Sequence, residues 1–344
     1  MRLGLGMGRW AALLLGLSLV VAGCDAATPT PTPELTPSPT ATLAGTPTAS
    51  PQPTPTAPPT PTAPPIASPT PTLTPPPPPE GLVVERTLPY ATAGECGERL
   101  RVCQQFVDVY RPAAGTGPWP VAVMIHGRPR APRDMAPLAE VVARAGAVVY
   151  NVDYRGVRPV GPGWPEAPED IACAMRYARA TAAQYGGDPT TLVLVGHSYG
   201  GYLGPLVALA GDEFDGDCLY AAEDLSALPT GFVGIAGNYV VEPAPVWNRW
   251  YRGNPRQQPE AWRMGEFRNH IGKNPQLRVR IIHERGDPII PPRQPRQFYR
   301  ALRDAGYDVT LTIISGKEHF ALLDPSGKGA LVVPLILELL GLEE

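Results

Sequence analysis

Ser198 stands in the run Gly-His-Ser-Tyr-Gly, with Gly196 two residues before it and Gly200 two residues after it. The strand-like run 191–194 precedes this pattern, and a helix-compatible run at 202–209 follows it. A serine at a tight strand-to-helix turn is held in strained backbone angles, and small flanking residues let the strand and helix pass closely. The pattern therefore predicts a nucleophile elbow and the chemistry of a serine hydrolase. The alternative is a serine that only caps a helix in an ordinary α/β domain.

A serine nucleophile needs a base, and in enzymes with such an elbow the acid and then the histidine follow the serine along the chain. Of the five histidines, His270, His283 and His319 lie beyond Ser198. His319 is in a loop directly after the alternating run 307–314, which predicts a strand. We therefore expect His319 to be the general base. The other two are interpreted as structural or surface histidines.

Asp287 is the expected acid of the site. It lies in a Gly-Asp-Pro sequence after the strand predicted at 279–282. A loop carboxylate there can reach the far nitrogen of His319, fix its tautomer and stabilise the imidazolium. Gly-Asp-Pro is also ordinary turn chemistry. The catalytic interpretation is favoured because serine, acid and histidine come in the required order and each follows a predicted strand.

Two backbone N–H groups are expected to stabilise an oxyanion beside the serine. The amide of Tyr199 lies at the start of the predicted helix, where N–H groups point toward negative charge. The apolar run 120–125 ends in His-Gly, which places the amide of Gly127 or Arg128 near the serine. His126 is interpreted as shaping this loop and not as a second base.

These residues have to be positioned by strands that end at one edge of a sheet. Strands are predicted at 82–86 and 104–110, a leading antiparallel pair, and at 121–125, 147–152, 192–195, 232–235, 279–282 and 309–314. Helical segments lie between them, and a closing helix is predicted at 330–340 with Pro334 near its start. This alternation predicts an α/β fold with a mostly parallel central sheet covered by helices on both faces.

The segment 237–276 interrupts the rhythm of strands and is expected to form a small cap over the sheet. Its aromatic residues could wall a substrate pocket or simply pack the cap on the core; they are Tyr239, Trp247, Trp250, Tyr251, Trp262 and Phe267. Arg128, Arg130 and Arg133 lie near the expected oxyanion loop and suggest substrates that carry a carboxylate or phosphate.

Residues 82–344 resemble the α/β-hydrolase superfamily, in particular its carboxylesterase, hormone-sensitive-lipase-like and kynurenine-formamidase-like branch. The motifs that carry the resemblance are 125–127 (Ile-His-Gly), 152–155 (Val-Asp-Tyr-Arg), 165–170, 185–189 and the elbow 196–201. The resemblance implies an α/β-hydrolase fold with a triad of Ser198, Asp287 and His319. The chain departs from many of these relatives after His-Gly, where Arg-Pro-Arg replaces a longer glycine run.

The expected reaction is hydrolysis of a small-molecule carboxylic ester through an acyl-enzyme on Ser198. An amidase or peptidase of the same fold is the near alternative because the same triad cleaves all these bonds. A surface binding protein that has lost catalysis is the alternative from another class. We expect no cofactor, and the net charge of −3 and the absence of a basic stripe argue against a nucleic-acid partner.

The first eighty residues indicate where in the cell the protein is located. Arg2 and Arg9 precede a short apolar run at 10–22, which predicts a signal peptide over 1–23. The sequence Val-Ala-Gly before Cys24 resembles a bacterial lipobox, which implies lipidation of Cys24. A plain signal peptide with a chance cysteine is the alternative. The Thr/Pro-rich residues 24–80 are expected to form a disordered, extended stalk. We therefore predict an extracytoplasmic, membrane-anchored protein with its catalytic domain at 81–344.

The cysteines fit export to an oxidising compartment. Besides Cys24, four cysteines remain, an even number. Cys96 and Cys103 are close in sequence and form the favoured pair, which leaves Cys173 and Cys218 as the second. Metal binding is not favoured, because no two cysteines have a short metal-ligand spacing with histidines.

Overall fold

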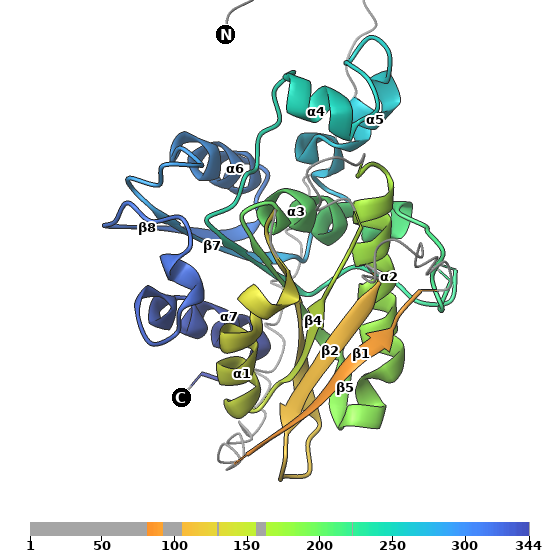
Figure 1. Ribbon diagram of the computed structural model, residues 1–344, viewed down its shortest axis with the longest axis vertical. Coiled ribbons are helices and arrows are strands. Elements are labelled where there is room, and N and C mark those ends of the chain that lie inside the picture. The colour runs from red at the N-terminus through yellow and green to blue at the C-terminus, as the bar shows by residue number, and fades with distance from the viewer. Residues whose placement is uncertain (1–80, 92–104, 129–130, 156–162, 222, 344) are drawn as a thin grey trace, which may run out of the picture. The chain divides into compact units, whose positions relative to one another are not determined.

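The computed structural model describes residues 81–91, 105–128, 131–155, 163–221 and 223–343 (Figure 1). All of them belong to the second of two compact units, Pro69–Glu344. The predicted signal peptide, Cys24, the stalk, and the cysteines at 96 and 103 lie outside the described residues. In the part of the chain that the structure describes, no helix has the length and apolar character needed to cross a membrane.

The described residues form an eight-stranded sheet with the strand order β1-β2-β4-β3-β5-β6-β7-β8. The strands are β1 (Leu82–Pro89), β2 (Phe106–Pro112), β3 (Trp119–Ile125), β4 (Val148–Val152), β5 (Gly187–His197), β6 (Gly231–Ile235), β7 (Arg278–Glu284) and β8 (Asp308–Ile314). β2 pairs antiparallel with both β1 and β4, and the strands from β4 to β8 pair in parallel. The predicted mostly parallel sheet with a leading antiparallel pair is therefore confirmed.

Helices cover both faces of the sheet (Figure 1). They are α1 (Ala136–Arg144), α2 (Glu166–Thr181), α3 (Gly200–Ala210), α4 (Pro245–Trp250), α5 (Pro259–Met264), α6 (Arg293–Asp304) and α7 (Val333–Leu340). Along β3, Val121, Val123 and Ile125 pack in a core shared with α2, α3 and α6. The alternate residues Ala122 and Met124 pack in a second core with α1 and α7. Successive side chains of a strand point to opposite faces, so this apolar strand needs a helical layer on each side.

The closing helix begins later than the sequence suggested. The predicted helix at 330–340 is a 3₁₀ turn, Lys328–Leu331, followed by α7, which begins at Val333. Pro334 lies in the first turn of α7, where its missing N–H is not needed by the helix. The proline therefore marks the start of the α-helix and not a position inside a longer one.

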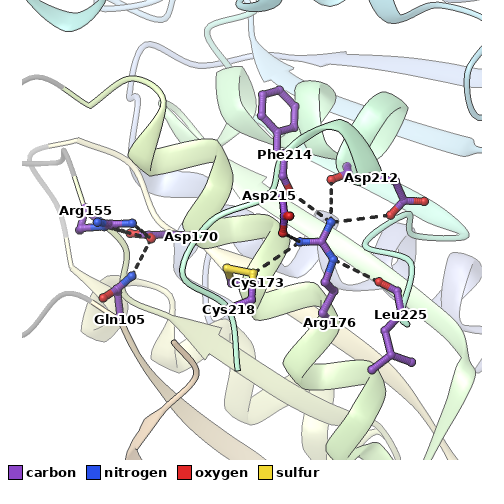
Figure 2. The surroundings of a disulfide bond; sticks show 11 residues. Gln105, Arg155, Asp170, Cys173, Arg176, Asp212, Phe214, Asp215, Cys218 and Leu225 are labelled. Atoms are coloured by element: carbon purple, nitrogen blue, oxygen red, sulfur yellow. Dashed lines mark hydrogen bonds and ion pairs between the residues drawn. A yellow bond between two sulfur atoms is a disulfide. The ribbon is translucent and has the colours of Figure 1, made fainter. Parts of the chain in front are cut away.

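A disulfide joins Cys173 of α2 to Cys218, in the loop that follows α3 (Figure 2). Arg176, one helical turn beyond Cys173, is fully buried, and its guanidinium donates to the backbone carbonyls of Phe214 and Leu225. Figure 2 shows this guanidinium among the carbonyl oxygens and carboxylates of the loop. The covalent bond and the buried arginine together fix the loop to α2. The pairing of Cys173 with Cys218 is the one expected from the sequence.

The segment predicted as a cap holds α4, α5 and a 3₁₀ turn at Phe267–His270. Trp247 of α4 stacks on Tyr199 and meets Tyr202 edge-on at the start of α3. Phe267 packs edge-on against Phe298 of α6. The segment is thus held by aromatic contacts to the two helices α3 and α6.

Candidate active site

Ser198 lies in a sharp turn between the end of β5 and the start of α3, and its φ of 53° is in the left-handed region. That region is unfavourable for a residue with a side chain. A Cβ on Gly196 would overlap the carbonyl oxygen of Gly200, and a Cβ on Gly200 would lie 2.5 Å from the carbonyl oxygen of Ile125. Both glycines are required because backbone approaches them closely. The structure has the strained turn that the sequence pattern predicted.

His319 and Asp287 lie in line with the serine. The Nε2 of His319 is 2.7 Å from the Oγ of Ser198, and its Nδ1 is 2.7 Å from the Oδ2 of Asp287. All three residues are more than nine-tenths buried. The structure therefore brings together the three side chains that the sequence selected.

The ends of three parallel strands explain how these distant residues meet. β5 ends at His197, one residue before Ser198, and β7 ends at Glu284, shortly before Asp287. β8 ends at Ile314, and the loop beyond it carries His319. Because parallel strands place their carboxyl ends at one edge of the sheet, the loops after them share one site.

The surroundings of Asp287 keep its carboxylate charged. Its Oδ1 accepts hydrogen bonds from the amides of Ile289 at 2.8 Å and Ile290 at 2.9 Å. Burial acts to raise the pKa of Asp287, but the His319 hydrogen bond and the two amides outweigh it, and the pKa lies below its ordinary value. Since an ionised carboxylate only accepts, the Nδ1 of His319 carries the proton. In the neutral imidazole, Nε2 is then the acceptor for the serine hydroxyl.

The other two candidate histidines serve the fold. His283 and His270 are fully buried. The Nε2 of His283 donates to the carbonyl of Ile290 at 2.9 Å, and the Nε2 of His270 donates to the carbonyl of Met264 at 2.7 Å. These contacts agree with the structural role expected for both residues.

His126 and Gly127 form the loop that runs past the serine. His126 is fully buried and stacked on Tyr154, whose hydroxyl donates to the His126 carbonyl at 2.7 Å. A Cβ on Gly127 would lie 2.9 Å from the Cβ of Ser198, so the backbone passes directly beside this serine. The loop therefore has the position expected of one wall of an oxyanion hole.

Tyr199, the other expected oxyanion donor, lies directly after Ser198 at the start of α3. It is the N-cap residue of α3, and the first amides of a helix have no acceptor within the helix. Its ring is almost fully buried against Trp247 and Trp250. Its N–H is thus at the positive end of α3, next to Ser198.

A cavity of about 450 Å³ opens onto Ser198. It is lined by Arg128, Ser198, Tyr199, Asn238, Val246, Trp247, Ile289 and Ile290. Val246 and Ile289 are more than half exposed and form an apolar rim. The guanidinium of Arg128 lies 5.8 Å from the centre of the Trp250 ring and brings a positive charge to an otherwise largely apolar wall. Among the described residues, no group of three or more His, Cys, Asp or Glu side chains is arranged to hold a metal ion.

Some residues of this lining could be predicted from the sequence, and others could not. Of the aromatic residues singled out in 237–276, Trp247 lines the cavity, whereas Tyr251 and Phe267 are buried in packing contacts. Asn238 and Ile289 were missed. Their positions in the sequence could have indicated both. Asn238 follows soon after the end of β6, and Ile289 lies just after Asp287 in the loop that follows β7. Loops after parallel strands meet at the edge of the sheet where the site forms.

Comparison with known proteins identifies the family. Residues 107–302 match the family BD-FAE. The chain belongs to the BD-FAE family. The matched segment runs from the second residue of β2 through most of α6 and includes Ser198 and Asp287, whereas His319 lies beyond it.

Curated relatives of this BD-FAE protein are esterases. Esterase LipC of Mycobacterium tuberculosis is 30% identical over 292 residues, which cover 73% of this chain and 69% of LipC. Esterase LipQ of the same organism is 27% identical over 191 residues, 49% of this chain and 41% of LipQ. A solved structure, a truncated carbohydrate esterase from gut microbiota, is 18% identical with a TM-score of 0.63, covering 75% of this chain and 96% of that one. The last comparison shows the shared fold.

Together these findings confirm the resemblance to α/β-hydrolase esterases that the sequence motifs carry. The BD-FAE protein is an enzyme that hydrolyses carboxylic esters.

Proposed function

We propose that Ser198 is the nucleophile of this ester hydrolysis and that the reaction passes through an acyl-enzyme. His319, oriented by Asp287, removes the hydroxyl proton as the Oγ attacks the ester carbonyl. The observation that carries the proposal is the 2.7 Å distance between the Nε2 of His319 and the Oγ of Ser198. The imidazolium then gives the proton to the leaving alcohol, and water releases the acyl group by the same route.

The tetrahedral intermediate needs donors aimed at its oxyanion. We assign this role to the Tyr199 amide, at the N-terminus of α3, and to the amide of Gly127 or Arg128, on the loop beside the serine. Fixed donors in a water-poor site stabilise the developing charge strongly, and the loss of one commonly costs about 100- to 1,000-fold in kcat. The proposal is supported by the closeness of Gly127 to Ser198.

The cavity suggests which esters fit. Its walls are mostly apolar, with Trp247 and Ile290 on the inside and Val246 and Ile289 at the rim. A volume of about 450 Å³ suits a small acyl or alcohol group better than a polymer chain. We therefore propose a short-chain ester as the substrate.

The test is hydrolysis of p-nitrophenyl esters of increasing acyl length by the full chain. We expect activity that falls with chain length and drops by at least about 10⁴-fold in Ser198→Ala. Ser226→Ala is the matched control, since this serine donates to Asp212 and lies apart from the triad. Undiminished turnover by Ser198→Ala would overturn the assignment of the nucleophile.

We further propose that the chain is exported and anchored to a bacterial membrane through lipidated Cys24. The support is the predicted signal peptide before Cys24, together with the Cys173–Cys218 disulfide, which suits an oxidising compartment. Expression in bacteria fed radiolabelled palmitate tests this. Label on the wild type and none on Cys24→Ser is expected, and an unlabelled, released wild type would contradict it.

A further inference from the structure

Glu284, the last residue of β7, is a fully buried carboxylate close to the triad. Its Oε1 accepts from the Nζ of Lys328 at 2.8 Å, and its Oε2 accepts from the backbone N–H of Glu318 at 2.7 Å. Glu318 is the residue immediately before His319. One buried side chain therefore holds the main chain of the loop that carries the histidine.

The path of this loop is built around the carboxylate. Gly316 has a φ of +151°, and a Cβ at this position would overlap the Oε2 of Glu284. The carbonyl of Gly316 accepts from the N–H of Gly286 at 2.8 Å. The hydrogen bonds from Glu318 to Glu284 and from Gly286 to Gly316 thus join the end of β7 and the loop after it to the loop after β8, just before Asp287 and His319.

A carboxylate removed from water is costly unless it is paired and hydrogen-bonded. Lys328 supplies the charge partner from the 3₁₀ turn that leads into α7. Without the Glu318 amide, one oxygen of Glu284 would lose the hydrogen bond that offsets its burial. The loop and the carboxylate therefore stabilise each other in one arrangement.

We propose that Glu284 is a positioning residue for the general base: it fixes the backbone before His319 and so holds the Nε2 within reach of the Ser198 hydroxyl. The inference rests on the proposed role of His319. Glu284 contacts the loop that carries His319, and it affects the reaction only through the position of that loop. A displacement of a catalytic group by about 1 Å can cost on the order of 100-fold in rate.

The experiment compares Glu284→Ala, Glu284→Gln and Glu284→Asp on p-nitrophenyl acetate, with the melting temperature of each. In Glu284→Ala we expect kcat to fall about 100-fold with KM changed less than about twofold, because alignment and not binding is lost. The rate of Ser198 phosphonylation should fall by the same factor. Glu284→Gln keeps an acceptor for the Glu318 amide and should retain kcat to within about tenfold. Glu284→Asp keeps the charge, but its shorter side chain moves the carboxylate oxygen away from the Glu318 amide. Its kcat should therefore be lower than that of Glu284→Gln.

Glu338→Gln is the matched control. Glu338 of α7 accepts hydrogen bonds from Arg280, on the same strand β7, at 2.8 Å and from Arg278 at 3.1 Å. This variant should lower the melting temperature and leave kcat unchanged.

The proposal is overturned if folded Glu284→Ala has the kcat of the wild type. It is also overturned if Glu284→Asp has a higher kcat than Glu284→Gln. The second comparison decides the matter if Glu284→Ala does not fold. Phosphonylation of Ser198 in the wild type shows that the proposed nucleophile is correct. If the wild type is labelled and the Glu284 variants behave otherwise than expected, only the role of Glu284 is wrong.

Discussion

The Nδ1 of His319 lies 2.7 Å from the Oδ2 of Asp287, whereas the nearest nitrogen of His283 lies 3.8 Å from the same oxygen. Both histidines are buried beside the acid, but only His319 also reaches the serine hydroxyl. The ring of His283 is instead turned so that its Nε2 donates to the Ile290 carbonyl. Burial and proximity to a carboxylate therefore do not distinguish the two histidines, whereas the contact with the Ser198 hydroxyl does.

The first prediction concerns the acid. Asp287→Asn should lower kcat by about 10⁴-fold, because an amide no longer selects the Nδ1–H tautomer of His319. Steady-state kinetics on a p-nitrophenyl ester measures this. Asp324→Asn is the matched control, since this exposed carboxylate accepts hydrogen bonds from the amide and hydroxyl of Ser326 in its own turn. Equal effects of the two substitutions would contradict the role of Asp287.

The second prediction concerns pH and stability. Burial lowers the pKa of His270 and of His283 below the ordinary value of 6.5. As the pH falls below about 6.5, the unfolded chain takes up protons at both residues while the folded protein does not. The free energy of unfolding should then decrease by up to about 1.4 kcal/mol per pH unit for each histidine. Above pH 6.5 the two histidines should add no pH dependence to the free energy of unfolding.

Urea denaturation between pH 7.5 and 5.5 measures this slope. His270→Gln removes one of the two groups, in the segment predicted as a cap, and its carboxamide can still donate to the Met264 carbonyl. The variant should show a shallower slope than the wild type. Identical slopes would rule out His270 as a contributor.

The third prediction concerns charge in the cavity. Arg128 is one of the residues that line the cavity at Ser198, and a guanidinium there is expected to bind a carboxylate on the substrate. Arg128→Ala should lower kcat/KM for an ester carrying a carboxylate by about 10- to 100-fold relative to a neutral ester of the same size. Arg133→Ala is the control, because this exposed residue is not among those lining the cavity. Equal loss on both esters would exclude anion recognition by Arg128.

The fourth prediction concerns the disulfide. The Cys173–Cys218 bond closes a loop with a sequence separation of 45, for which chain entropy gives a stabilisation of about 4 kcal/mol. The double substitution to serine should lower the free energy of unfolding by about 2–4 kcal/mol while kcat stays unchanged. Denaturant titration and the ester assay test both parts. A large loss of kcat in the folded variant would show that the loop after α3 contributes to the site.

Much of the site could be predicted from the sequence because its residues lie directly after strands. Strand patterns are local, and the carboxyl ends of parallel strands share one edge, so Ser198, Asp287 and His319 could be placed without knowing the packing. The elbow glycines added a second local signal. The order of the strands in the sheet and their pairing follow from tertiary contacts, and only the structure gives them.

The cavity lining and the role of Glu284 could not be predicted in the same way. Trp250 and Trp247 lie in the same short helix, yet Trp250 is buried and Trp247 lines the cavity. Which face of a short helix meets the cavity depends on how it packs on α3. Glu284 looks like a strand-end residue in the sequence, and its partners at 318 and 328 become visible only when the loops are folded together.

The most direct test of the proposed nucleophile is labelling of the full chain by a fluorophosphonate, with the adduct located by peptide mass spectrometry. One adduct on the peptide containing Ser198 is expected, with none in Ser198→Ala and normal labelling in Ser226→Ala. An adduct on a different residue, or a folded and ester-hydrolysing wild type that takes up no label, would show that Ser198 is not the nucleophile.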